Sequence, residues 1–186
     1  MPVVLRSATS PPVTAEETER IYNTAFRWTE AEGIVPLSAG GGFSSSISAE
    51  AVSADGKVIV GRLINDIGLI QAYRWTEESG NVPLPDLPGG SIGGNAVGVS
   101  NHGGLIVGFG EDASGAVPFL WSEAAGTRNL ADVLRYDYNL GDALQGWSLS
   151  IDGGDLDISA DGSTIIGTGR NPQGQIEGWR ASLVDD

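Results

Sequence analysis

The 186-residue sequence contains no cysteine, which excludes disulfide bonds, thiol nucleophiles and metal sites built on thiolates. Basic residues are few: ten Lys and Arg stand against 24 Asp and Glu, and the formal net charge is −14. Such a charge repels phosphate backbones and anionic lipid surfaces. We therefore expect no nucleic-acid partner, and cations or cationic surfaces fit the chain better.

Long apolar runs are missing as well. No stretch reaches the ~20 apolar residues of a membrane-spanning helix, so we expect no membrane insertion. The first residues, Met1 to Arg6, lack the charged start and the longer apolar core of a signal peptide. The sequence as it stands therefore predicts no export signal.

Glycine, in contrast, is abundant, with 28 of the 186 residues, about twice its ordinary usage. The sequence also repeats itself. In each of three segments Trp is followed five residues later by Gly and nine residues later by Leu. These segments are AFRWTEAEGIVPL (Ala25–Leu37), AYRWTEESGNVPL (Ala72–Leu84) and PFLWSEAAGTRNL (Pro118–Leu130).

A second repeated element is a serine that stands eight residues before a glycine. The pairs are Ser53 and Gly61, Ser100 and Gly108, and Ser159 and Gly167. The distance from the tryptophan to this serine is 25 residues in the first two units and 38 in the third. The basic period is therefore 46 to 47 residues, and the third unit holds an insertion of 13 residues.

The two ends of the sequence align with parts of the repeat. PVVLRS (Pro2–Ser7) aligns with the later VIVGRL, and EGWRASL (Glu177–Leu183) aligns with the tryptophan segments. We expect one β-repeat domain with units at about 2–53, 54–100, 101–159 and a half unit at 160–184. Because the ends fall inside units, we expect a piece of a longer array, an open arc, or self-association that completes a ring.

Each unit predicts four short antiparallel strands. In the first full copy they are Ala25–Thr29, Ile34–Leu37, Glu50–Ser53 and Val58–Arg62. Four strands in about 46 residues are typical of a β-propeller blade, and the fold class is predicted as all-β and propeller-like. A β-solenoid and an open stack of meanders are the alternatives.

The repeated tryptophan, glycine and arginine residues have predicted positions in the sheets. One tryptophan per unit is expected to pack between blades, and one glycine per unit is part of the repeated strand. These repeat anchors are Trp28, Trp75, Trp121, Trp179, Gly61, Gly108 and Gly167. Arg27 and Arg74 lie on the opposite strand face, where we expect solvent-side pairs with Glu30 and Glu77.

The insertion predicts the one helix near residues 130–145. Asn129 is placed to cap it, and Leu130, Val133, Leu134 and Tyr138 fall on one helical face. Trp147 lies outside the repeat and, with Tyr136 and Tyr138, is a candidate for contact with a ligand.

Few residues suggest catalysis. His102, the one histidine, occupies the turn position that Asp55 and Asp161 fill in the other units, so we interpret it as a turn residue. A Ser-His-Asp triad is the alternative. The acidic group Asp152, Asp155, Asp157 and Asp161 is interpreted as solvated loop residues, with a calcium site or a pair of glycosidase carboxylates as alternatives. No other cofactor is expected.

Together, the pattern A-[FY]-x-W, the later G-x-x-x-L and the S-x-D-G turn before V-I-V-G resemble the HAF-type extracellular repeat of bacteria. The resemblance runs from about Pro2 to Leu183, and Leu144–Leu183 is similar to the C-terminal end of such proteins. It implies a secreted or surface-exposed β-repeat protein and carries over no catalytic residues.

These patterns favour a non-catalytic interaction module at the cell surface or outside the cell, which binds a protein or a glycan through loops at one rim. The first alternative is a glycan hydrolase or lyase that uses residues between Asp152 and Asp161. The second is a structural spacer without a ligand.

Overall fold

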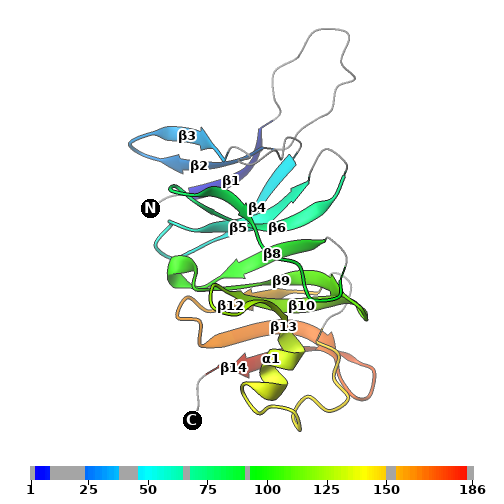
Figure 1. The fold of residues 1–186 in the computed structure, drawn as a ribbon. Helices are drawn as coiled ribbons and strands as arrows, with labels where there is room; N and C mark the ends of the chain where they lie inside the picture. The colour runs from blue at the N-terminus through cyan, green and yellow to red at the C-terminus, as the bar shows by residue number, and fades with distance from the viewer. Residues whose placement is uncertain are drawn as a thin grey trace.

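The computed structural model describes residues 3–8, 24–37, 46–64, 68–90, 93–149 and 154–183. Their strands form four antiparallel sheets, which we number I to IV in chain order. Figure 1 shows the sheets stacked one below another, with sheet I at the top and sheet IV at the bottom. Within each sheet the strands are neighbours in the order in which the chain supplies them.

Two of the sheets have four strands and two have three among the described residues. Sheet I consists of β1 (Val3–Ala8), β2 (Thr24–Thr29) and β3 (Gly33–Pro36). Sheet II consists of β4 (Ser46–Val52), β5 (Ile59–Ile64), β6 (Ile70–Thr76) and β7 (Gly80–Pro83). Sheet III consists of β8 (Gly94–Val99), β9 (Leu105–Asp112), β10 (Gly115–Ser122) and β11 (Gly126–Asn129). Sheet IV consists of β12 (Leu156–Ile158), β13 (Thr164–Arg170) and β14 (Ile176–Ser182).

The predicted all-β class is confirmed, and so are the short antiparallel strands. Antiparallel pairing in every described sheet excludes a β-solenoid, whose strands run parallel. The sequence units and the sheets are offset from one another. The unit boundaries after Ser53 and Ser100 fall in the turns β4–β5 and β8–β9, so each of these turns joins the first and second strands of one sheet.

Three apolar layers hold the stack together, one between each pair of successive sheets. Between sheets I and II the layer is centred on Tyr73 and Trp75, with Leu37 and Ile59 beside them. The next layers use corresponding positions of sheets II to IV. The second contains Val60, Ala96, Ile106 and Phe119, and the third contains Val107, Leu120, Leu156 and Ile165.

The repeated glycines let neighbouring strands approach closely. Gly61 pairs with Tyr73, and Gly108 with Phe119. A Cβ atom at Gly61 would lie 2.0 Å from the carbonyl oxygen of Ser48. At Gly108 it would lie 2.2 Å from the carbonyl oxygen of Asn95 and 2.5 Å from the ring of Phe119. Any side chain at these positions would therefore push adjacent strands apart.

The strand register corrects the position of the fourth tryptophan. Trp75 pairs with Ile59 and Trp121 with Ile106, whereas Ile165, the equivalent residue of sheet IV, pairs with Ala181. Trp179 instead pairs with Gly167 and takes the place of Tyr73 and Phe119. The alignment by tryptophan was therefore wrong by two residues, because the glycine opposite the aromatic ring determines the register.

The insertion forms the predicted helix, α1 (Leu130–Tyr136). Asn129 caps it by accepting a hydrogen bond from the N–H of Ala131, at 2.9 Å. Leu130, Val133 and Leu134 are buried in the layer between sheets III and IV. Tyr138 lies beyond the end of the helix but packs against the same layer. None of the described helices has the length and apolar character needed to cross a membrane.

Candidate functional site

The serine turns form a network of short hydrogen bonds at one edge of the stack. The Ser53 hydroxyl donates to Asp55 Oδ1 at 2.6 Å and accepts from the N–H of Val58 at 3.0 Å. The N–H of Lys57 also donates to Asp55 Oδ1, at 3.1 Å. Because these donors stabilise the carboxylate, the Ser53 hydroxyl foremost, the pKa of Asp55 falls to about 2.

The turn before β13 repeats this arrangement. Ser159 Oγ donates to Asp161 Oδ1 at 2.5 Å, and the N–H of Ser163 donates to the same oxygen at 2.9 Å. The hydroxyl of Ser159 lowers the pKa of Asp161 to about 2, with help from Ser163. The two Asp-Gly turns are therefore built alike, and their carboxylates are held by the turns themselves.

The middle turn differs because a histidine replaces the aspartate. It forms a single 3-10 turn, η1 (Asn101–Gly103), in which His102 has a φ of 60°. His102 Nδ1 lies 2.7 Å from Asp55 Oδ2 in the preceding turn. The glycine after the variable residue has a positive φ in all three turns: 72° at Gly56, 70° at Gly103 and 74° at Gly162. The interpretation of His102 as a turn residue is confirmed.

The same contacts contradict a Ser-His-Asp triad at this place. In such a triad the histidine lies between the serine and the aspartate, so that it can remove the hydroxyl proton. Here Asp55 lies between Ser53 and His102. The Ser53 hydroxyl is buried and already bonded to Asp55 and to the Val58 N–H, which leaves it no role as a nucleophile.

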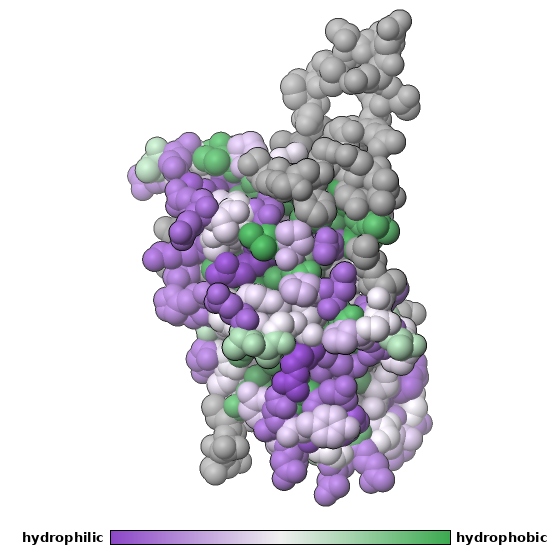
Figure 2. Space-filling view, in the orientation of Figure 1, coloured by the Kyte–Doolittle hydropathy of each residue, from purple (hydrophilic) through white to green (hydrophobic). Residues whose placement is uncertain are grey.

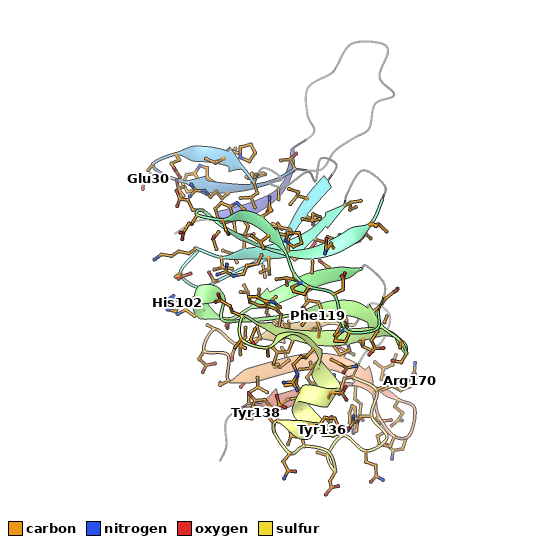
Figure 3. The ribbon with its side chains drawn as sticks, viewed as in Figure 1. Glu30, His102, Phe119, Tyr136, Tyr138 and Arg170 are labelled. Carbon is orange, nitrogen blue, oxygen red and sulfur yellow. The ribbon has the colours of Figure 1, made fainter. Side chains whose placement is uncertain are left out.

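A cleft of about 770 Å³ opens beside these turns, along the edges of sheets I and II and as far as His102 of the β8–β9 turn. Figure 3 shows Glu30 and His102 on the same side of the stack, one at each end of this region. The volume lies in the range of sites for small ligands or short segments. The cleft is lined by residues of β2, of the Asp55 turn and of the β6–β7 hairpin, together with His102.

Cationic side chains and an indole ring are combined in the cleft. The guanidinium of Arg27 lies 5.7 Å from the ring centre of Trp75, a cation–π contact between sheets I and II. Arg27 also pairs with Glu32 at 2.7 Å and with Glu77 at 3.5 Å. The expected solvent-side pair with Glu30 is therefore wrong, because Arg27 points between the sheets.

Arg74 is the other cation of the cleft wall, and its predicted pair with Glu77 is also absent. Its Nε is buried without a hydrogen-bond partner. Among the described residues, no acid forms an ion pair with its guanidinium, and Glu77 pairs with Arg27 instead. A buried donor of this kind carries a desolvation cost that a bound acceptor would offset.

The acidic residues that were the alternative calcium or glycosidase site do not form a cluster among the described residues. Asp161 is held in its turn, and Asp157 Oδ1 accepts a hydrogen bond from the N–H of Ile158 at 2.8 Å. No group of three or more metal-ligating side chains, Asp155 included, converges in the part of the chain that the structure describes. Asp152 lies outside that part.

The aromatic residues of the insertion are only partly brought together. Trp147 and Tyr138 line a second cavity of about 450 Å³, which Trp179 also lines. Tyr136 does not line it: its ring is 72% exposed and lies under the guanidinium of Arg135, at 5.9 Å. Apolar side chains from α1 and the segment after it make up most of the remaining wall.

Sequence reasoning missed Arg27 and Arg74 as residues of a site. A signal was present, because both arginines directly precede a repeated tryptophan. What the sequence does not give is the face on which the next sheet packs, and this face decides whether such an arginine meets water or an indole ring.

Antiparallel meanders of up to four strands, packed face to face, match the blades of a β-propeller, and comparison with solved structures agrees. The chain is similar to TolB from Acinetobacter baumannii, with a TM-score of 0.54 and 13% identity over 91% of this chain and 37% of that one. It is also similar to a TolB candidate from Agrobacterium tumefaciens, with a TM-score of 0.52 and 17% identity over 86% of this chain and 51% of that one.

Both neighbours are β-propeller folds, so the propeller-like prediction is confirmed. This chain spans between about a third and a half of their length. No family model and no curated protein matches the sequence.

Proposed function

We propose that this chain is a non-catalytic interaction module that binds an acidic segment of a partner protein in the cleft along the edges of sheets I and II. The observation that carries the proposal is Arg74, which is among the residues that line the cleft and whose Nε is buried without a hydrogen-bond partner. A carboxylate accepts two parallel hydrogen bonds from a guanidinium, which is the strongest pairing available to such a group.

The remaining chemistry of the cleft supports a protein segment as the ligand. Trp75 supplies an apolar surface, while Lys57 and Glu78 offer charges of both signs at the rim. A mixed lining of this kind suits a peptide, which presents apolar, acidic and basic groups together. The protein's overall negative charge disfavours nucleic acid and anionic lipid as occupants.

The location follows from the HAF-type resemblance. Since that resemblance implies secreted or surface-exposed proteins, we propose that the module acts outside the cell. Its partner is then another exported or surface protein.

Selection of peptides from a random display library on the immobilised chain tests the proposal. Enriched peptides are expected to share an Asp or Glu, and exchange of that residue for its amide should weaken binding about tenfold or more. Arg74→Met should cause a similar loss, measured by fluorescence polarisation with the selected peptide. Arg128→Met is the matched control, because Arg128 pairs with Asp137 away from the cleft.

Two results would overturn this function. Binding of the selected peptide that is unchanged in Arg74→Met and in the amide peptide would show that the cleft is not the site. Turnover of a glycan that is lost in Asp155→Ala would show an enzyme instead of a binding module.

A further inference from the structure

The two faces of a sheet in this stack carry different side chains. The face toward the next sheet holds Val60 in sheet II and Val107 in sheet III, and both are fully buried. The face toward the preceding sheet holds the repeated tryptophan, which is 9% exposed at Trp75. An interface between successive sheets therefore joins the valine face of one sheet to the tryptophan face of the next.

Sheet I presents a tryptophan face that no described sheet covers. Val3 pairs with Trp28 as Ile59 pairs with Trp75, so the two tryptophans are equivalent. Trp28 is nevertheless 39% exposed, and its cross-strand neighbour Ile34 is 64% exposed. Phe26, on the same face, is buried, so the uncovered part is the end with Trp28 and Ile34.

Sheet IV presents the opposite kind of face at the other end of the stack. Ile166 takes the place of Val60 and Val107 in the register but is 51% exposed. It pairs with Arg180, which is exposed and is the register equivalent of Arg27 in sheet I. Figure 1 places β2 near the upper end of the stack and β14 at the lower end, far from one another.

We propose that a second copy of this chain docks head to tail, with the Ile166–Arg180 face of sheet IV on the Trp28–Ile34 face of sheet I. The internal contact between sheets I and II is the template. There Arg27 lies over Trp75 and pairs with Glu77. In the dimer Arg180 lies over Trp28 of the other copy and pairs with its Glu30, which is two residues after the tryptophan as Glu77 is.

Charge and apolar character both fit this occupant. The exposed Arg180 meets the exposed carboxylate of Glu30, and the apolar Ile166 meets Trp28 and Ile34. Figure 2 shows apolar surface on sheet I among hydrophilic residues at the upper end of the molecule. The contact is heterologous, because it joins two different surfaces, the sheet I face of one copy and the sheet IV face of the other. Two copies that close a ring make this contact twice.

Sedimentation equilibrium over a concentration series tests the proposal. The chain is expected to reach twice its single mass of 19.2 kDa. Arg180→Glu and Glu30→Arg should each weaken the dimer about tenfold or more, and the double variant with both changes should recover it. Arg135→Glu carries the same charge change on α1 and should leave the dimer intact.

A mixing experiment tests the head-to-tail arrangement itself. Trp28→Arg blocks the sheet I face and Arg180→Glu blocks the sheet IV face, so each variant alone is expected to be monomeric. Mixed, they should form a one-to-one complex through the two faces that remain. Ile34→Asp replaces Trp28→Arg if the latter does not fold.

Three outcomes would overturn the proposal. A mass of one chain at every concentration would show that the end faces are not used. Dimers that persist in both single charge variants would place the contact elsewhere. Failure of the two blocked variants to combine would exclude the head-to-tail geometry.

Discussion

His102 Nδ1 lies 2.7 Å from Asp55 Oδ2, although the two residues are 47 positions apart in the chain. They occupy the same position of successive turns, so the contact joins the edge of sheet II to the edge of sheet III. It also explains why the middle turn differs from its neighbours. An aspartate at position 102 would place two carboxylates side by side at this distance.

This relationship predicts that His102→Asp, which copies the other two turns, lowers stability more than His102→Asn does. Asparagine tolerates the positive φ of this position and can bond to Asp55, whereas aspartate repels it. The difference in the free energy of unfolding should be small, as for other exposed charge pairs, with His102→Asp the less stable variant. Denaturant unfolding of the two variants at neutral pH measures it, and equal stability would contradict the role of the contact.

A second prediction concerns the repeated glycine of sheet III. Gly108→Ala should destabilise the protein by about 1 to 3 kcal/mol, because the new Cβ would meet the Asn95 carbonyl oxygen and the ring of Phe119. Gly104→Ala is the matched control: its φ of −70° suits alanine and nothing lies within 4 Å. There we expect a gain of about 0.4 to 1 kcal/mol.

Thermal or denaturant unfolding of both glycine variants decides the matter. Opposite signs are expected from the same chemical change at two positions only four residues apart. A loss of equal size at both positions would show that the close approach of strands at Gly108 does not explain the repeated glycine.

The turns lead to a prediction on acid stability. The pKa of Asp161 is lowered from 3.8 to about 2, so the folded state binds its proton less readily than the unfolded state. The resulting stabilisation is complete above about pH 4 and is lost as the pH falls toward 2. Asp161→Asn should therefore be less stable than the natural protein at pH 5, with the difference shrinking between pH 4 and pH 2.

Ser159→Ala separates the two contributions of this turn. It removes the hydroxyl that donates to Asp161 and also accepts from the Thr164 N–H. We expect a constant loss from the Thr164 bond at every pH and a smaller acid dependence than in the natural protein. Free energies of unfolding measured from pH 5 to pH 2 give both parts, and an unchanged pH slope would contradict the assignment to Ser159.

Much of the fold could be predicted because the fixed spacing of the repeat shows which residues of successive units are equivalent. The serine, the turn glycine and the strand glycine recur at fixed spacing, and each has a local physical role that the structure shows. Trp179 was aligned with the repeated tryptophan because both residues are tryptophan, whereas its pairing with Gly167 depends on the folded sheet. Each unit has two aromatic positions on this strand, those of Tyr73 and Trp75, and residue identity alone did not show which of them Trp179 occupies.

The candidate site was harder to predict, for a related reason. Strand alternation shows that Arg27 and Trp28 point to opposite faces, but it does not show which face meets another sheet. Arg27 is placed against Trp75 by the stacking of sheets, and Arg74 Nε is buried without a hydrogen-bond partner. Both environments depend on how sheets from different repeats pack in the assembled fold.

The last prediction concerns Asn129, which has two partners. Its side-chain oxygen caps α1 at the N–H of Ala131, and its Nδ2 donates to Asp112 Oδ2 at 2.9 Å. Asn129→Ala loses both bonds and should cost about 1 kcal/mol or more. Serine retains the cap without the second bond, so Asn129→Ser should be intermediate.

Aspartate would usually cap a helix as well as serine does. At position 129, however, its carboxylate would face that of Asp112, whose pKa is already lowered by Ser114 and Asn129 and which is therefore charged at neutral pH. We expect Asn129→Asp to be less stable than Asn129→Ser at pH 7, in denaturant unfolding followed by circular dichroism. Equal or greater stability of the aspartate variant would show that the cap alone, and not the link to Asp112, governs this junction between sheet III and α1.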